Sequence, residues 1–356
     1  TLALALLEEK PNRVLECLFT TSEETGMDGA VAFDYSKITA RQMLNLDSED
    51  ENEAIVSCAG GCHLKIYRTF GKTAASGSAL RVRVGGFAGG HSGSDIHLGK
   101  VNAARRLGKL LTKICEKYDC RLIRFEGGEK DNAIPTDAYA ELLIGEGAEP
   151  ELAELFKRAQ KTVTAADAAA EISFERYSYS GDAFDTHATK QICKLIATIP
   201  NGVVSRYEHI DLVKTSLNTG VVRAADGEFL LHSMIRSSDD AEKDQLTDEV
   251  CALAAGMGFS YEKDGQYPSW GYAEHSPLRE IYIDAYRRVY GHEPRVCGIH
   301  AGLECGFIKS AIPDMDILSL GPTMRDIHTV NERLDMDSCA RFMQMLRLIV
   351  HGHEAK

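Results

Sequence analysis

Three carboxylates and a histidine follow stretches of the sequence that read as buried strands. Glu23 and Glu24 come directly after the apolar run Val14–Phe19, Asp47 follows a second such run, and His328 lies beyond a third. Open α/β sheets bind ligands beyond the carboxyl ends of their strands, and like charges gathered there repel unless a cation or a proton compensates them. These residues therefore predict a hydrolytic metal centre; a solvated pair of loop carboxylates is the alternative for Glu23 and Glu24.

The types of these side chains also indicate which metal they would hold. Carboxylate oxygens with an imidazole nitrogen suit Zn²⁺ or Mn²⁺, and the absence of thiolates at these positions argues against a structural cysteine site. The ten cysteines lack the paired spacing of a zinc finger. We interpret them as scattered reduced thiols rather than a disulfide framework, which favours the cytoplasm.

The two ends of the chain predict an α/β domain. Strands are expected at 14–19, 41–46, 54–58 and 315–320, and helices at 1–10, 277–290 and 335–350. Strand 14–19 is apolar on both faces apart from Glu16, as a strand inside a covered parallel sheet would be.

The middle of the chain predicts a second domain of α+β type. Segments 63–70 and 79–84 alternate apolar and polar residues like an antiparallel hairpin, and another hairpin is expected over 215–236 with its turn at Asp226-Gly227. Helices are expected at 98–118, 149–170, 185–199 and 239–256, with a strand at 121–125. We therefore expect a catalytic domain of residues 1–60 and 273–356, interrupted by an inserted domain of residues 61–272.

Composition narrows the classes of partner. The chain has 356 residues, enough for two domains, and a formal net charge of −13. Nucleic acids and anionic membranes bind proteins through clustered Lys and Arg, and this chain is acidic, so neither is an expected partner. No run approaches the roughly 18 apolar residues that a transmembrane helix needs.

The glycine-rich segment 85–93 invites two other interpretations that its spacing does not support. A dinucleotide-binding loop needs a second glycine two positions after the first, but Phe87 and Ala88 stand there. A serine-hydrolase elbow, Gly-x-Ser-x-Gly, would need glycine where the chain has Ser94. His91, in the same segment, is by itself an ordinary loop histidine.

Six segments taken together resemble the aminoacyl-histidine dipeptidases (Xaa-His dipeptidases), part of the larger dizinc family of carnosinases, aminoacylases and glutamate carboxypeptidases. The segments are TTSEETGMDGA (20–30), LNLDSE (44–49), GGHSG (89–93), DNAIP (131–135), AGLECG (301–306) and GPTMRDIH (321–328). Each one is weak alone, but all occur in the family's order. The resemblance implies a zinc-peptidase-like α/β catalytic domain with an inserted α+β lid that also carries the dimer interface.

The resemblance further implies roles at the metal centre of a dipeptidase that cleaves dipeptides, including those with a C-terminal histidine. Two zinc ions are expected, with Mn or Co as alternatives. Glu23 would be the general base that takes a proton from a metal-bridging water. Glu24 and His328 would bind one ion, and Asp47 would bind the other.

Substrate contacts are implied for four further residues. His91 matches the histidine that, in related dimers, reaches into the partner's site to stabilise the oxyanion. Arg236 matches a position that holds the substrate's C-terminal carboxylate, for which a guanidinium is suited. Asn218 and Glu304 are weaker candidates for substrate contacts. A cytoplasmic homodimer is expected.

In this family a His-x-Asp motif and a bridging aspartate lie upstream of a helix like the one expected at 1–10. We therefore expect this sequence to be most of such a dipeptidase, with those ligands preceding Thr1. Two alternatives stay open: an inactive fragment that acts as a dimerising or binding module, and an N-acyl amino acid amidohydrolase of the same fold.

Overall fold

The computed structural model describes residues 2–9, 11, 13–145, 149–208 and 210–352, and the chain divides into two compact units. Unit 1 comprises residues 1–60 and 267–356, and unit 2 comprises residues 61–266. We expected the inserted segment to extend to residue 272, but the chain already belongs to unit 1 from Tyr267. The reason is that Trp270 forms an antiparallel bridge with Cys58, at the end of a unit 1 strand.

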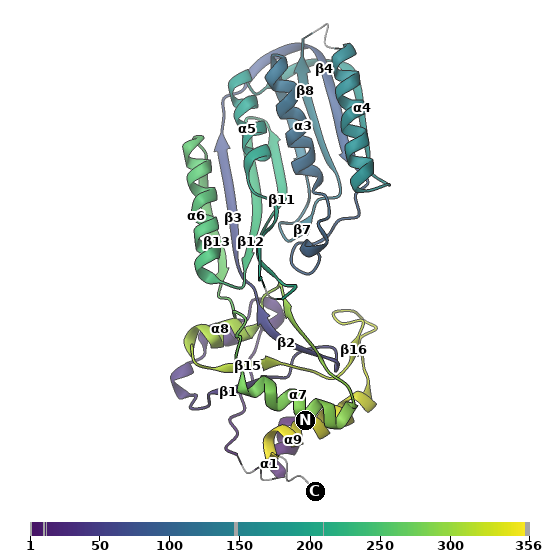
Figure 1. The fold of residues 1–356 in the computed structure, drawn as a ribbon. Coiled ribbons are helices and arrows are strands. Elements are labelled where there is room, and N and C mark those ends of the chain that lie inside the picture. Colours follow the sequence, from purple (N-terminus) through teal and green to yellow (C-terminus); the bar gives the residue numbers. More distant parts are fainter. Residues whose placement is uncertain (1, 10, 12, 146–148, 209, 353–356) are drawn as a thin grey trace. The chain divides into compact units, whose positions relative to one another are not determined.

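Unit 1 is built on a mixed four-stranded sheet (Figure 1). Its strands lie in the order β1 (Gln42–Asn45), β15 (Asp316–Ser319), β2 (Glu53–Cys58) and β14 (Arg295–Ile299). β1 pairs with β15 in parallel, β14 pairs with β2 in parallel, and β15 meets β2 antiparallel. The predicted α/β class is confirmed for this unit, although β14 was not expected and the sheet is not purely parallel.

Helices cover both faces of this sheet. Successive strand residues point to opposite sides, and apolar residues on each side pack against helices. Tyr282 of α7 (Pro277–Tyr290) and Phe342 of α9 (Met336–His351) lie in one core with Leu318. The neighbouring strand residue Ile317 belongs to a second core with Ile308 of α8 (Glu304–Ala311). Figure 1 shows α7 and α9 on one side of β15 and α8 on the other. Two short helices, α1 (Leu2–Glu8) and α2 (Asp28–Ala32), complete the unit.

The predicted strand Val14–Phe19 is wrong. The segment is extended but pairs with no strand in the described part of the chain, and Val14 is 91% exposed. It is held instead by Glu16, whose Oε2 accepts hydrogen bonds from the backbone N–H groups of Thr39 at 3.1 Å and Ala40 at 3.3 Å. An apolar run alone did not distinguish a paired strand from an extended segment.

An ion pair between partly exposed Arg341 and buried Glu51 ties α9 to the loop after β1. Arg341 Nε donates to Glu51 Oε2 at 2.9 Å and Arg341 Nη2 donates to Glu51 Oε1 at 2.6 Å. Glu51 is 9% exposed. These hydrogen bonds hold the pKa of Glu51 below its usual value of 4.5, because they favour the ionised carboxylate.

We expect Glu51→Gln to lower the melting temperature at neutral pH but not in acid. Because the folded-state pKa of Glu51 is lowered, its stabilisation is fully present above the unfolded-state pKa and is lost as pH falls through the folded-state pKa. Thermal unfolding of both proteins from neutral to about pH 3 measures this. Glu9→Gln is the control. It breaks a more exposed contact, in which two nitrogen atoms of Arg347 in α9 donate hydrogen bonds to Glu9, and it should lower the melting temperature less. A melting-temperature loss that is independent of pH would contradict the prediction.

Unit 2 is a nine-stranded sheet with long helices packed against it (Figure 1). The strand order is β13-β3-β12-β11-β6-β8-β4-β9, with β10 (Gly202–Arg206) paired to β11. The ordered strands are β3 (Gly60–Thr69), β4 (Thr73–Gly85), β6 (Cys120–Gly127), β8 (Ala138–Ile144), β9 (Glu171–Ala183), β11 (Val213–Ala225), β12 (Glu228–Ser237) and β13 (Ser260–Tyr267). The helices are α3 (Ala103–Lys117), α4 (Glu149–Ala166), α5 (Thr186–Thr198) and α6 (Asp240–Gly256), and one large apolar core joins them to the sheet.

The predicted α+β character of this unit agrees with the structure, with one wrong pairing. β11 and β12 form the expected hairpin, and both turn residues, Asp226 and Gly227, have positive φ. β3 and β4 do not form a hairpin: β3 lies between β13 and β12, whereas β4 lies between β8 and β9. Both strands alternate as expected, but alternation does not specify the partner.

Among the described residues, no helix combines the length and the apolar character needed to cross a membrane.

Candidate active site

Glu23 and Glu24 lie in a tight turn of 3₁₀ helix, Glu23–Thr25, that leads into α2. The turn folds back on its own entry: Met27 N–H donates to the Ser22 carbonyl at 2.9 Å and Gly29 N–H donates to the Thr21 carbonyl at 3.0 Å. A Cβ at Gly29 would lie 2.5 Å from the Thr21 nitrogen, so this position requires glycine. The two glutamates are therefore held on a compact, closed turn.

Asp47 is placed by the close approach of two strand ends. β1 and β15 are parallel, and their pairing continues beyond both strands: Leu320 N–H donates to the Asn45 carbonyl at 2.9 Å and Ser48 N–H donates to the Leu320 carbonyl at 3.2 Å. A Cβ at Gly321 would overlap the Ser48 carbonyl oxygen. Asp47 therefore lies beside the start of the segment that carries His328.

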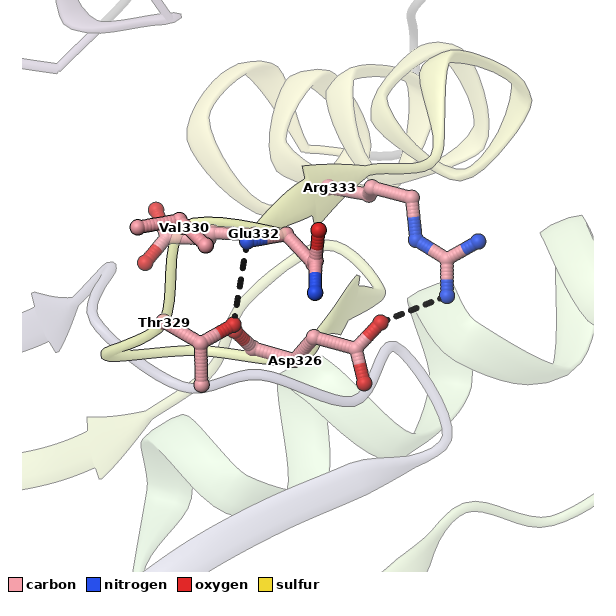
Figure 2. A pocket seen from close by; sticks show the side chains of 6 residues that line it. Asp326, Thr329, Val330, Glu332 and Arg333 are labelled. Atoms are coloured by element: carbon pink, nitrogen blue, oxygen red, sulfur yellow. Dashed lines mark hydrogen bonds and ion pairs between the residues drawn. The ribbon is translucent and has the colours of Figure 1, made fainter.

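His328 lies on a loop closed by two short paired strands, β16 (Met324–Arg325) and β17 (Arg333–Leu334). Figure 2 shows Arg333 reaching Asp326 across the base of this loop, with 2.6 Å between Nη2 and Oδ2. Inside it, the Asn331 N–H donates to Thr329 Oγ1 at 3.1 Å. The residues of this loop line a shallow, open hollow, so they form a shaped surface beside His328.

These two loops bring His328 and Glu24 into contact. His328 Nε2 and Glu24 Oε1 are 3.1 Å apart, although the residues are 304 positions apart in the sequence. Both side chains remain largely exposed, at 66% and 69%. The structure therefore joins two of the predicted metal ligands directly.

Asp47 and Glu23 lie in the electric field of this pair. Loss of surrounding water, followed by the charge of Glu24, raises the pKa of Asp47, and the charge of His328 opposes the rise. The pKa of Glu23 is raised first by burial and then by the charges of Asp47, Glu24 and Glu304. The four predicted residues thus form one acidic neighbourhood with a surplus of negative charge.

Within the described ranges, no three His, Cys, Asp or Glu side chains form a metal-binding cluster. The sequence prediction places at most two of them, Glu24 and His328, on one ion and Asp47 on the other. The donor types and the unbalanced negative charge fit divalent metal, and the distribution expected from the resemblance does not require a three-residue cluster.

Backbone strain gathers around these residues. Among the described residues, five other than glycine have positive φ, and four of them are Ser22, Met27, Asp326 and His328. The fifth is Asp226 in the hairpin turn of unit 2. Such conformations cost roughly 1–3 kcal/mol each and are retained where the surroundings impose them, commonly at functional sites. Nothing in the sequence around Ser22 or Met27 indicated this strain.

Glu304 belongs to the same neighbourhood. It begins α8, and its Oε2 accepts a hydrogen bond from Thr20 Oγ1 at 2.8 Å, just before the Glu23–Glu24 turn. A role for Thr20 could not be predicted from local sequence, because the contact joins residues 284 positions apart.

Unit 2 brings His91 and Arg236 near each other. His91 lies in β5 (Gly90–His91), which pairs with β7 (Ala133–Ile134), and Arg236 is 5% exposed in β12. Burial and then the charge of Arg236 lower the pKa of His91, so its neutral form is favoured at pH 7.

The hydrogen bonds of His91 also select its tautomer. The backbone N–H groups of Gly93 and Ser94 donate to Nδ1 at 3.2 and 3.1 Å. Nδ1 is therefore an acceptor, and the proton of the neutral ring is assigned to Nε2. A neutral imidazole with Nε2–H is a hydrogen-bond donor that can stabilise developing negative charge on an oxygen.

Asn218 is buried and makes three hydrogen bonds within unit 2. Its Nδ2 donates to the carbonyls of Asp131 at 2.9 Å and Ala133 at 2.8 Å, and its Oδ1 accepts from Asn102 Nδ2 at 3.3 Å. Ala133 is the β7 residue paired with His91. Asn218 is thus engaged with the segment that supports His91. Asn102 belongs to the same hydrogen-bond network and also caps α3, and its role was not predicted from the sequence.

The fold and the acidic site define a class of enzyme. A model of "Peptidase family M20/M25/M40" matches residues 1–351, so the chain belongs to this family of metal-dependent peptidases. Cytosol non-specific dipeptidase of Escherichia coli (strain K12) is 32% identical over 363 residues, which cover 99% of this chain and 75% of the relative. The crystal structure of aminoacylhistidine dipeptidase from Vibrio alginolyticus matches with a TM-score of 0.93 at 31% identity, covering 98% of this chain and 73% of that one. The resemblance inferred from the six sequence segments is confirmed.

Proposed function

We propose that this chain carries the base, metal ligands and substrate-binding groups of a metal-dependent dipeptidase. The observation that carries the proposal is the contact between Glu24 and His328, with Glu23 and Asp47 in the same acidic neighbourhood. The two relatives described above are both named dipeptidases. Dipeptides are the proposed substrates, including those with a C-terminal histidine, as in the name of the Vibrio enzyme.

Glu24 and His328 would hold one divalent ion and Asp47 another, with Zn²⁺ as the first choice and Mn²⁺ or Co²⁺ as alternatives. When bound, such ions polarise the scissile carbonyl and make water a better nucleophile at neutral pH. Burial raises the pKa of Asp47 and Glu23 most, and the charge of the ions would offset the repulsion between carboxylates that raises it further.

Glu23 is the proposed general base. It adjoins a proposed ligand on the compact turn, and His328 Nε2 pairs with Glu24 rather than with Glu23, which leaves the Glu23 carboxylate for proton transfer. It would accept a proton from the attacking water and return it to the departing amine.

The substrate contacts are proposed from unit 2. In the proposed dimer, neutral His91 would donate Nε2–H to the developing oxyanion in the site of the partner subunit, and Arg236 would bind the C-terminal carboxylate of the dipeptide. For Asn218 we propose support of the β5–β7 segment in place of direct substrate contact, since its amide is engaged there. Unit 2 is also proposed to serve as lid and dimer interface, in a cytoplasmic homodimer.

A substrate panel tests the proposal. The protein should hydrolyse unblocked dipeptides with zinc present and lose activity after chelation. Comparison of an Xaa-His dipeptide, a dipeptide without histidine and an N-acetyl amino acid separates a dipeptidase from an amidohydrolase of the same fold. Cleavage of the N-acetyl amino acid alone would contradict the proposal and favour the amidohydrolase.

A further inference from the structure

One oxygen of Glu304 is buried and has no hydrogen-bond partner in the described part of the chain. Oε2 accepts the hydrogen bond from Thr20, but Oε1 is buried without a hydrogen-bond partner among the described residues. A buried polar atom left unsatisfied costs about 1–3 kcal/mol, and more when it is charged. Such atoms are rare in native proteins and call for a partner that the chain itself does not supply.

The position of Glu304 is fixed rather than accidental. The preceding loop is anchored to the end of β2, where Ala59 N–H donates to the Ala301 carbonyl at 3.0 Å. After Glu304, helix α8 lies so close to the chain at Pro268 that a Cβ on Gly306 would overlap the Pro268 carbonyl oxygen. Glu304 is in the first turn of this helix, where the helix dipole favours a negative charge.

The missing partner must be cationic or a strong donor. The negative charge of Glu304 contributes to the raised pKa of both Glu23 and Tyr35, so the carboxylate lies within the acidic neighbourhood of the proposed base. An anion or a carbonyl oxygen is unsuited to this place.

We propose that Glu304 binds the free α-ammonium group of the dipeptide substrate, with Thr20 holding the carboxylate in position. This assignment rests on the proposed dipeptidase function. A dipeptide carries one positive charge, at its N-terminus, and an ammonium group has three N–H donors of which one can fill the vacant side of Oε1. Acetylation of that nitrogen removes the charge and leaves the buried Oε1 of Glu304 without a partner, so the site should reject N-blocked peptides.

The test compares one dipeptide with its N-acetyl form in the wild-type protein and in Glu304→Gln. Wild type should prefer the unblocked dipeptide, and the variant should lose roughly 10²-fold in kcat/KM for it, mostly through KM, while the N-acetyl form changes little. Zinc content should be unchanged. Glu280→Gln, an exposed acid in the first turn of α7, is the matched control and should leave both substrates unaffected. Thr20→Val should also lower kcat/KM for the unblocked dipeptide. This second variant tests the assignment if Glu304→Gln does not fold.

Three outcomes would overturn the assignment. They are zinc loss in Glu304→Gln, an equal loss for blocked and unblocked peptides, and an unchanged preference for the unblocked form. Calorimetric titration with the unblocked dipeptide separates this assignment from the proposed function. If wild type binds the dipeptide without cleaving it, the function fails, and the Glu304 assignment stands only if Glu304→Gln weakens that binding. If no dipeptide binds at all, both fail.

Discussion

Glu23→Gln is expected to lower kcat for dipeptide hydrolysis by roughly 10²- to 10⁴-fold, the range for loss of a general acid–base group. Glutamine matches glutamate in size, so the compact turn that holds Glu23 and Glu24 should keep its shape. The amide cannot take up the proton of the attacking water. KM should change much less than kcat, because the lost interaction operates in the transition state.

Zinc content distinguishes Glu23 from its neighbour. Glu23→Gln should retain zinc near the wild-type amount, whereas Glu24→Gln should lose zinc, because Glu24 is in contact with His328 and is a proposed ligand. Elemental analysis and turnover should be measured on the same preparations. Retained turnover in Glu23→Gln would refute its role as base, and zinc loss in that variant would make it a ligand.

Gly321→Ala is expected to be the most disruptive single methyl addition near the site. The new Cβ would overlap the Ser48 carbonyl oxygen, a backbone atom that cannot rotate away. Overpacking of this kind costs about 1–3 kcal/mol, and relief requires the ends of β1 and β15 to separate. Because Asp47 precedes Ser48 and His328 follows Gly321, the variant should also bind zinc more weakly.

The control for Gly321→Ala is Gly71→Ala, since a Cβ at Gly71 would meet nothing within 4 Å. Chemical denaturation and zinc titration of both variants measure the two expected effects. A Gly321→Ala protein with wild-type stability and zinc affinity would show that the strand ends are not held together as tightly as the structure indicates.

Local signals in the sequence predicted the local structure well. α7 spans the predicted residues 277–290 because Ser276 caps its start, Pro277 occupies its first turn and Gly291 ends it in a left-handed conformation. The Asp226-Gly227 turn was equally predictable, since both residues tolerate positive φ. These features depend on a few neighbouring residues.

Long-range pairings could not be predicted in the same way. β3 and β4 each have the alternation of a strand, but their partners lie elsewhere in the sheet. Val14–Phe19 has the composition of a buried strand and pairs with none in the described residues. At the site, the contact of Glu24 with His328 agrees with what the family resemblance implied, whereas the strand expected just before Glu24 is not formed. The Thr20–Glu304 hydrogen bond depends on side-chain geometry across the unit and had no sequence signal.

The central claim is that the acidic neighbourhood of Glu23, Glu24, Asp47 and His328 belongs to a metal-dependent dipeptide-cleaving centre. The most direct measurement follows amino acid release from an unblocked dipeptide by the natural protein before chelation, after chelation and after return of Zn²⁺. We predict activity, loss of activity and recovery, in that order. Hydrolysis that persists unchanged in the chelated, zinc-free protein would contradict the claim.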